Sequence, residues 1–144
     1  MLRLDGFLPY RLNVLAKRIS QALARLYEDR FGISIPEWRV LATLGERQPL
    51  SSNDIVERTR MDKAKVSRAV SRLAEAGLLD RQPHPEDQRL LRLSFTPEGR
   101  ALYDRLAPQA LEWERRLLED FSAEDVRALD GLIDRLNDRL DRMR

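Results

Sequence analysis

The spacing of apolar residues is helical along almost the whole chain and becomes a strict alternation in only one short stretch. Apolar side chains three and four residues apart share one face of a helix, whereas alternation gives one face of a strand. The first helical run covers residues 7–27 and carries Leu8, Leu12, Leu15, Ile19, Leu23 and Leu26. The alternation lies at 91–95, after a strand-like segment at 78–81 and a turn at 83–87. The chain is therefore predicted to be mainly α-helical with one small β-hairpin, an α+β fold.

Capping residues predict where the helices begin and end. Short polar side chains at a helix start accept hydrogen bonds from free backbone N–H groups, and glycine is favoured just past a helix end. The predicted caps are Ser34 with Glu37, Ser51 or Ser52, Asp62, Thr96 with Pro97, and Ser122 with Asp125. The predicted ends lie at Gly32, near Gly45 and at Gly77. The expected order is four helices, the hairpin and two more helices.

The helix predicted at residues 62–76 has two chemically different faces. Its inward face consists of Val66, Ala69, Val70 and Leu73. Its outward face consists of Ala64, Ser67, Arg68, Ser71 and Arg72, flanked by Lys65. Small residues allow close approach to a DNA major groove, while hydroxyl and guanidinium groups can bond base edges and phosphates. Lys63 and Lys65 stand in the first turn, where the helix dipole also favours a phosphate.

An ordinary surface helix with a cationic stripe is the alternative interpretation of this segment. The neighbouring elements favour DNA binding, because a short capped helix at residues 51–59 precedes it and a hairpin follows it. This order is typical of a helix-turn-helix unit with a wing, in which the second helix reads bases and the first contacts the backbone. The predicted DNA contacts are Ser51, Ser52, Lys63, Ala64, Lys65, Ser67, Arg68, Ser71, Arg72 and Arg89.

Arg89 stands just past the turn of the hairpin, with Asp87 two positions before it. An arginine at the tip of a wing can enter the minor groove, where the potential is most negative. Asp87 is predicted to support the Arg89 guanidinium through a charge-assisted hydrogen bond. The alternative is a solvated ion pair on the surface, which contributes almost nothing to stability.

Residues 34–106 resemble the MarR family of winged-helix regulators. The matching segments are Pro36-Glu37-Trp38-Arg39-Val40-Leu41, Asp62-Lys63-Ala64-Lys65-Val66-Ser67-Arg68, Leu73-Ala74-Glu75-Ala76-Gly77-Leu78, Asp87-Gln88-Arg89 and Leu93-Ser94-Phe95-Thr96-Pro97-Glu98-Gly99-Arg100. The family wing often reads Asp-Arg-Arg, so Gln88 departs from it and one cationic contact is missing there. The resemblance implies a winged helix-turn-helix fold with long dimerisation helices at both ends, and a repressor of transcription that a small ligand releases from double-stranded DNA.

Dimerisation is expected from the resemblance and, independently, from the apolar faces at the two ends of the chain. The faces are Leu8-Leu12-Leu15-Ile19 and Leu129-Leu132-Leu136-Leu140, which a domain of this size cannot both cover. The alternative is that either face folds back onto its own subunit. The expected parts are an N-terminal dimerisation helix at 1–33, a DNA-binding lobe at 34–96 and C-terminal dimerisation helices at 97–144. A two-fold homodimer is expected to read a pseudo-palindromic operator.

A small aromatic effector is a further expectation from the resemblance. The opening Phe7-Leu8-Pro9-Tyr10-Arg11-Leu12-Asn13-Val14-Leu15 resembles a subgroup that responds to hydroxycinnamoyl-CoA thioesters or related aromatic acids. The candidate ligand-binding residues are Tyr10, Arg11, Asn13, Trp38 and Trp113. Arg11 would pair with an anionic ligand and the aromatic rings would stack on it. Packing in the core is the alternative role, above all for Trp38.

Composition narrows the remaining classes of function. The 144 residues include no cysteine, which excludes disulfides and thiol chemistry, and the lone histidine at 84 makes a metal site unexpected. No cofactor is expected either. The absence of a long apolar run or a signal-peptide pattern favours a cytoplasmic protein that does not bind membranes. The alternatives are an enzyme, for which no catalytic cluster is visible, and a helical dimer that binds a ligand or is purely structural without binding DNA.

Overall fold

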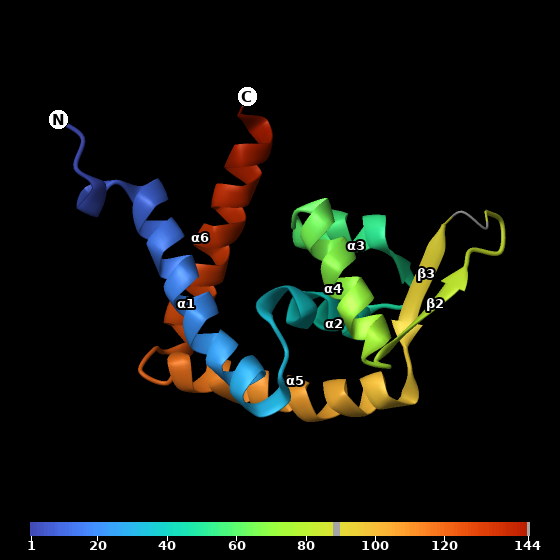
Figure 1. Ribbon diagram of the computed structural model, residues 1–144. Coiled ribbons are helices and arrows are strands. Elements are labelled where there is room, and N and C mark those ends of the chain that lie inside the picture. Colours follow the sequence, from blue (N-terminus) through green and yellow to red (C-terminus); the bar gives the residue numbers. More distant parts are fainter. Residues whose placement is uncertain (88–89, 144) are drawn as a thin grey trace. The chain divides into compact units, whose positions relative to one another are not determined.

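The computed structural model describes residues 1–87 and 90–143 (Figure 1). The chain divides into two compact units, Met1–Ala110 and Leu111–Arg144, which are described separately below. In chain order the elements are η1 (Leu4–Gly6), α1 (Leu8–Phe31), α2 (Ile35–Glu46), β1 (Leu50–Ser51), α3 (Ser52–Thr59), α4 (Lys63–Glu75), β2 (Leu79–Pro83), β3 (Leu91–Phe95), α5 (Pro97–Leu117) and α6 (Ala123–Arg142). The predicted fold class, mainly α-helical with a small antiparallel sheet, is confirmed.

The predicted capping residues do begin these helices. The Ser34 hydroxyl accepts a hydrogen bond from the Glu37 N–H at 3.3 Å at the start of α2. Of the two candidate serines before α3, Ser51 is the cap, and it forms a reciprocal pair with Asp54. The Asp62 carboxylate accepts hydrogen bonds from two N–H groups at the start of α4. Local sequence therefore determines where these helices start, whatever packs against them.

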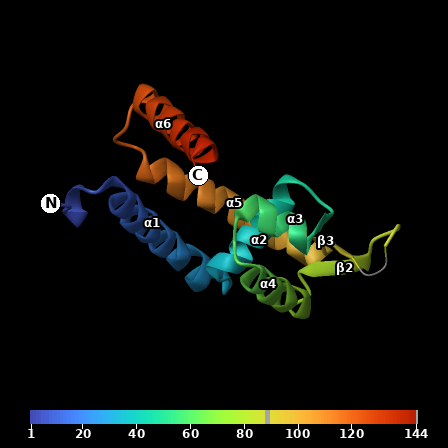
Figure 2. The same cartoon turned by 90° about the horizontal axis from the view of Figure 1, so that it is seen from above.

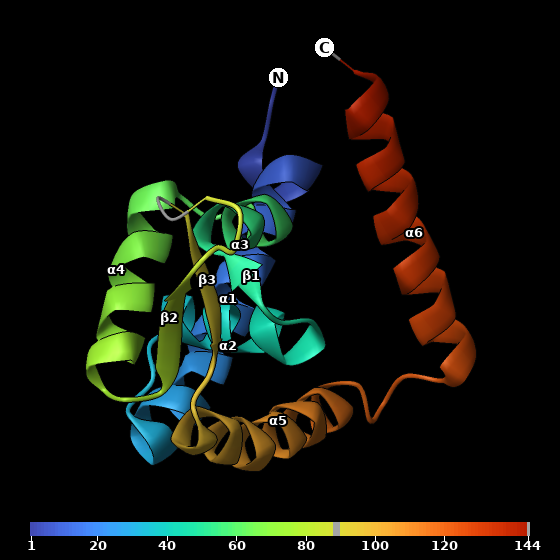
Figure 3. The ribbon, with the colours of Figure 1, turned by 90° about the vertical axis from the view of Figure 1, so that its right-hand side faces the viewer.

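The sheet has three strands in the order β1-β3-β2 (Figure 3). The predicted hairpin is the antiparallel pair β2–β3, which runs from Leu79 opposite Phe95 to Pro83 opposite Leu91. The sequence did not predict β1, whose two residues pair with β3 through Leu50 opposite Leu93. A strand of two residues is too short to show any alternation, so only its partner strand reveals it.

A hydrophobic core joins α2, α3 and α4 to the base of the sheet. The inward face of α4 that the sequence predicted is buried, and Val66 and Leu73 have no exposed surface. They form one cluster with Leu41 and Leu44 of α2, Ile55 of α3, Leu93 of β3 and other buried residues. Burying each of these aliphatic side chains contributes about 1.5–3 kcal/mol before conformational entropy is subtracted. Figure 2 shows α2, α3 and α4 gathered beside the base of the hairpin. The core therefore fixes which side of α4 faces solvent.

A tight junction links the end of α4, the hairpin and the start of α5. Gly77 ends α4 in the left-handed conformation, with φ of 77°, as the sequence predicted. The Thr96 hydroxyl donates to the Gly77 carbonyl at 2.6 Å and accepts from the Gly99 N–H at 3.0 Å. The Thr96 N–H also donates to the Leu78 carbonyl at 3.1 Å. Thr96, the cap of α5, is thus hydrogen-bonded to the residues that follow α4. These bonds fix the position of the start of α5 relative to the end of α4.

The long helices at the two ends of the chain leave apolar faces uncovered. In the first unit, Leu8, Leu12 and Leu15 of α1 are between 43% and 49% exposed. In the second unit, the leucines of α6 at 129, 132, 136 and 140 are between 42% and 64% exposed. Apolar faces of this length on separate helices are expected to pack against another chain. Among the described residues, no helix is long and apolar enough to cross a membrane.

Candidate nucleic-acid interface

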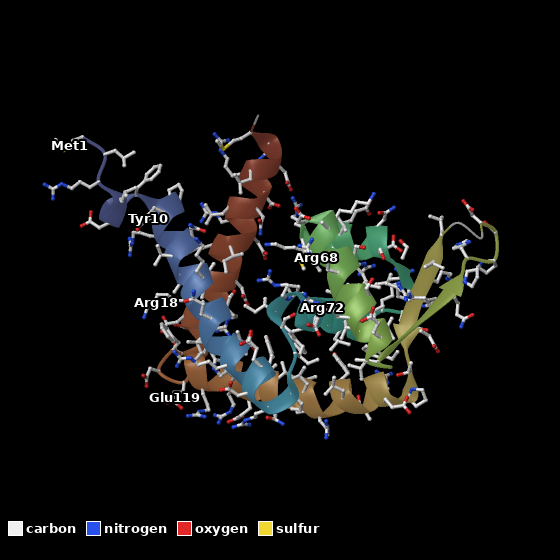
Figure 4. The ribbon with its side chains drawn as sticks, viewed as in Figure 1. Met1, Tyr10, Arg18, Arg68, Arg72 and Glu119 are labelled. Carbon is white, nitrogen blue, oxygen red and sulfur yellow. The ribbon has the colours of Figure 1, made fainter. Side chains whose placement is uncertain are left out.

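The exposed side of α4 carries cations and small side chains and no carboxylate between its first residue and Ala74. Lys63, Ala64, Lys65, Ser67, Arg68 and Arg72 are exposed, and Ser71 is half-buried. Figure 4 labels Arg68 and Arg72 along this helix. The structure therefore places all seven α4 residues predicted to contact DNA at or near the surface. The combination of small residues, hydroxyls and guanidinium groups suits a helix that enters a major groove.

The N-terminus of α4 is already occupied by a carboxylate. The Asp62 Oδ1 atom accepts hydrogen bonds from the Ala64 N–H at 2.7 Å and the Lys65 N–H at 3.3 Å. The helix dipole and the free N–H groups of the first turn are therefore used by the protein itself. Asp62 therefore takes up two of the first-turn N–H groups that could otherwise bind a phosphate, which the sequence alone did not reveal.

The start of α3 carries the other two predicted contacts, Ser51 and Ser52, both half-buried. The Asp54 carboxylate accepts a hydrogen bond from the Ser51 N–H at 2.9 Å, and the Ser51 hydroxyl accepts one from the Asp54 N–H at 3.1 Å. The bond from the Ser51 backbone holds the pKa of Asp54 below its ordinary value of 3.8. The Ser51 hydroxyl oxygen therefore accepts the capping hydrogen bond, and the hydroxyl proton can still be donated in a further bond.

The wing consists of β2, β3 and the turn between them. Two backbone hydrogen bonds lie in the turn. The His84 N–H donates to the Leu90 carbonyl at 2.8 Å, and the Leu90 N–H donates to the Asp87 carbonyl at 3.0 Å. The Glu86 N–H donates to His84 Nδ1 at 3.1 Å, which uses one nitrogen of the only histidine. Gln88 and Arg89 lie outside the described residues, so the predicted minor-groove contact and its support by Asp87 stay predictions.

A shallow hollow of about 180 Å³ lies between α4 and the start of α2. Its lining consists of Lys65, Arg68, Ala69 and Arg72 from α4 with Ser34 and Pro36 from the start of α2. Sequence reasoning named the three cations but not Ser34 or Pro36 as part of this surface. These residues are about thirty positions apart in the chain, so no local pattern joins them.

The predicted effector residues fall into three places. Tyr10 and Arg11 line a groove of about 430 Å³ along α1, together with Asp5, Leu8, Leu12, Val14, Leu15 and Arg18. Asn13 is exposed on the same helix but does not line this groove. Trp38 packs against the core and stacks on Tyr27, with ring centroids 4.8 Å apart. Trp113 belongs to the second unit and is half-buried there. Of the predicted effector residues in the first unit, Tyr10 and Arg11 line the same groove.

Tyr27 is a buried residue that the sequence did not single out. Its ring is 1% exposed, and its hydroxyl has no hydrogen-bond partner among the described residues. Burial raises the pKa of this phenol above its ordinary value, although the nearby Arg39 charge opposes the shift. In the sequence this position is an ordinary member of the apolar face of α1, so nothing there reveals an unpaired hydroxyl.

Comparison with known proteins identifies a group of similar chains. A family model described as the MarR family matches residues 31–90. The HTH-type transcriptional regulator PecS of Dickeya dadantii (strain 3937) is 31% identical over 125 residues, which cover 85% of this chain and 75% of PecS. The homoprotocatechuate degradative operon repressor of Escherichia coli is 28% identical over 119 residues, 83% of this chain and 80% of the repressor.

Solved structures agree along nearly the full length. A MarR/EmrR family transcriptional regulator from Acinetobacter sp. ADP1 superposes with a TM-score of 0.89 and 30% identity, over 99% of this chain and all of that one. The PcaV transcriptional regulator of Streptomyces coelicolor, solved in complex with its natural ligand, gives a TM-score of 0.78 and 27% identity over 96% of each chain. The similarity thus includes the long terminal helices as well as the lobe that carries α4.

Proposed function

Because this chain belongs to the MarR family of transcription regulators, we propose that it is a repressor that binds a pseudo-palindromic operator as a homodimer and leaves it when a small aromatic acid binds. The chain itself is a DNA-binding transcription regulator of the helix-turn-helix type. Its proposed action is binding alone, with no reaction catalysed. The proposal adds the DNA-contacting residues, the arrangement of the operator and the effector.

The observation that carries the proposal is the solvent-facing side of α4. The core buries Val66 and Leu73, so the opposite side of the helix must point away from the protein. That side presents Ala64, Ser67 and Arg68 with no acidic side chain among them. In a helix-turn-helix unit the second helix enters the major groove, and α4 occupies that position after α3. We assign the contacts to the α3 start, to α4 and to Arg89 of the wing, with Asp87 as its support.

The homodimer supplies two copies of α4 at a fixed separation. Its proposed interface is formed by the exposed apolar faces of α1 and α6, which the isolated chain leaves in contact with water. The proposed parts are residues 1–33 and 97–144 for dimerisation and residues 34–96 for DNA binding. A two-fold dimer places its half-sites about one helical turn of DNA apart, about 34–36 Å.

The proposed effector site uses the groove on α1. Arg11 offers a positive charge for a carboxylate, and Tyr10 offers a ring for stacking. The name of the Escherichia coli relative contains homoprotocatechuate, an aromatic acid, which supports an effector of this class. PcaV was solved in complex with its natural ligand, which supports a bound ligand in a regulator of this fold. Trp113, Trp38 and Asn13 remain candidates for further contacts.

The first experiment measures DNA binding against salt concentration. Fluorescence anisotropy with labelled promoter-proximal duplexes gives the dissociation constant at several salt concentrations. The logarithm of the binding constant is expected to fall with the logarithm of salt, with a slope of about −0.9 for each phosphate contacted. Absence of binding, or binding that does not respond to salt, would contradict the DNA-binding surface proposed for α4.

A second experiment addresses the effector. A thermal-shift panel of aromatic acids and their CoA thioesters is expected to contain compounds that stabilise the protein and release the labelled duplex. Arg11→Gln is expected to remove the response, whereas Lys17→Gln keeps it because Lys17 does not line the groove. If no compound stabilises the protein, or if both variants respond alike, the assignment of this groove is wrong.

A further inference from the structure

The exposed surface of α4 is divided into two chemically distinct stripes. Lys65, Arg68 and Arg72 line the hollow beside the start of α2. Ser67 and Ser71 do not line it. Residues 65 and 67 differ by about 200° around an α-helix, since each residue turns it by about 100°. The cations therefore lie on the side of the helix that faces the start of α2, and the hydroxyls lie away from it, with Ala64 between the two.

The charges in the hollow are not compensated by the protein. Among the described residues, no carboxylate forms a salt bridge with Lys65, Arg68 or Arg72. Glu37, the acidic residue in the first turn of α2, is bound to the Ser34 hydroxyl, which donates to its Oε1 atom at 2.8 Å. Like charges spaced three and four residues apart on a helix repel one another unless an anion lies between them.

The lining of the hollow suits an oxyanion. Its volume of about 180 Å³ is several times the roughly 30 Å³ that a water molecule occupies in the liquid. Ala69 and Pro36 form apolar parts of the lining, and its polar parts come from Ser34 and the three cationic residues. Guanidinium groups bond phosphate oxygens through two parallel N–H groups, and an ammonium adds a point charge.

We infer that this hollow holds one backbone phosphate of the operator, so that Lys65, Arg68 and Arg72 position α4 while Ala64, Ser67 and Ser71 read the bases. The inference rests on the proposed function, because it assigns roles within the DNA-binding surface. Phosphate contacts fix the register of a protein on DNA and carry no sequence information directly, whereas contacts to base edges specify the sequence. It also adds the start of α2, through Ser34 and Pro36, to the DNA-facing surface.

The position of the cationic flank supports a phosphate rather than a base as its partner. A helix in the major groove directs its outermost residues at the base edges, and its flanks run beside the two sugar-phosphate strands. The hollow is a flank of this kind, since one wall belongs to α4 and the other to the start of α2. Ala64 and Ser71 lie on the outermost side of the helix, roughly opposite its buried residues, and their short side chains allow the close approach that contact with base edges requires.

The test pairs protein variants with modified DNA. In each half-site, phosphates are replaced one at a time by uncharged methylphosphonates, and binding is measured for the wild type and for Arg72→Gln. One replacement is expected to weaken DNA binding by the wild type at least about tenfold. The same replacement is expected to have little further effect on DNA binding by Arg72→Gln, because both changes remove the same contact. Lys63→Gln is the matched control for coupling, since Lys63 is an exposed cation of the same helix that does not line the hollow. Whatever affinity this variant loses, the replacement that couples to Arg72→Gln is expected to weaken its binding as much as it weakens that of the wild type.

Sequence preference is measured on operators that each carry one substituted base pair. Arg72→Gln is expected to weaken binding to all of these operators by the same factor. It is also expected to reduce the magnitude of the salt slope by about 0.9 per subunit. Ser67→Ala is expected to reduce the difference between the operator and one substituted variant. If Arg72→Gln instead changes the preference at one base pair, or if no methylphosphonate couples to it, the inference is wrong.

Three controls separate the possible failures. If the wild type binds no duplex, the proposed function fails before the hollow is tested. Arg72→Lys retains a charge and is expected to keep most of the salt slope, while thermal melting checks that both variants fold. Inorganic phosphate added at constant ionic strength is expected to stabilise the wild type little; strong stabilisation that Arg72→Gln abolishes, with no coupling to methylphosphonates, would assign the hollow to a free anion and overturn the inference.

Discussion

Replacing Gly99 with alanine tests the junction that joins α4 to α5. A Cβ atom at this position would lie 1.9 Å from the Leu78 carbonyl oxygen and 2.9 Å from the Leu78 carbonyl carbon. Real Cβ atoms essentially never approach other atoms closer than 3.0 Å. The start of α5 or the chain at Leu78 must therefore shift by about 1 Å, because the obstructing atoms are backbone and cannot rotate away.

The expected loss of stability follows from what that shift disturbs. The Leu78 carbonyl accepts from the Thr96 N–H at 3.1 Å, and the Thr96 hydroxyl bonds the Gly77 carbonyl at 2.6 Å. Overpacking costs about 1–3 kcal/mol, and each weakened hydrogen bond costs about 1 kcal/mol. Alanine regains about 0.5–1 kcal/mol through its higher helix propensity. The net loss is about 2–4 kcal/mol, a large part of the roughly 5–15 kcal/mol that stabilises a typical domain.

Urea denaturation followed by circular dichroism measures this loss at a fixed protein concentration, because the proposed dimerisation would make stability concentration-dependent. Gly131→Ala is the matched control. Gly131 lies inside α6, a Cβ atom there meets nothing within 4 Å, and its side of the helix is about 200° from Leu129. The control is expected to gain about 0.5–1 kcal/mol. If Gly99→Ala is as stable as the wild type, the close approach of α5 to Leu78 is not present in the protein.

Three further changes test other features. Tyr27→Phe removes a buried hydroxyl without a partner among the described residues, so urea denaturation is expected to show equal or higher stability, by up to about 1–2 kcal/mol; a clear loss would reveal a hidden partner. Asp54→Asn removes a carboxylate whose pKa is lowered in the folded state. The variant is therefore expected to have a lower free energy of unfolding than the wild type above pH 3.8, and the difference is expected to disappear as the pH falls below that value. A difference that does not change with pH would contradict the assigned bond to the Ser51 N–H. Leu136→Glu places a charge on the apolar face of α6, and analytical ultracentrifugation is expected to show monomers; an unchanged dimer would exclude this face from the interface.

Most secondary structure was predictable because its signals are local. Ser34, Asp62 and Ser122 are each followed within two or three residues by the backbone N–H that they cap, so a short window of sequence contains the whole interaction. The strand β1 was missed for the opposite reason, since its two residues are defined by a partner more than forty positions away. The choice between Ser51 and Ser52 as the cap of α3 also required the structure.

The candidate site divides in the same way. The cationic and hydroxyl residues of α4 were predictable, because helical spacing alone separates its inward from its outward face. Trp38 illustrates the limit: its ring was an open choice between ligand contact and packing, and the structure shows a stack on Tyr27 that no local pattern predicts. The unpaired hydroxyl of Tyr27 was equally hidden, because hydrogen-bond satisfaction depends on every neighbour in space.

The spacing of apolar residues therefore determined, without any structure, that this chain is a set of helices with one hairpin and that residues 62–76 expose a cationic side. Local capping and periodicity suffice for this, since they depend on residues within one or two helical turns. Only the tertiary structure decided that the cations on one flank of α4 meet Ser34 and Pro36 across a hollow. Side chains distant in sequence become neighbours only when the core fixes how α2 and α4 pack, and that packing assigns each flank of α4 its surroundings.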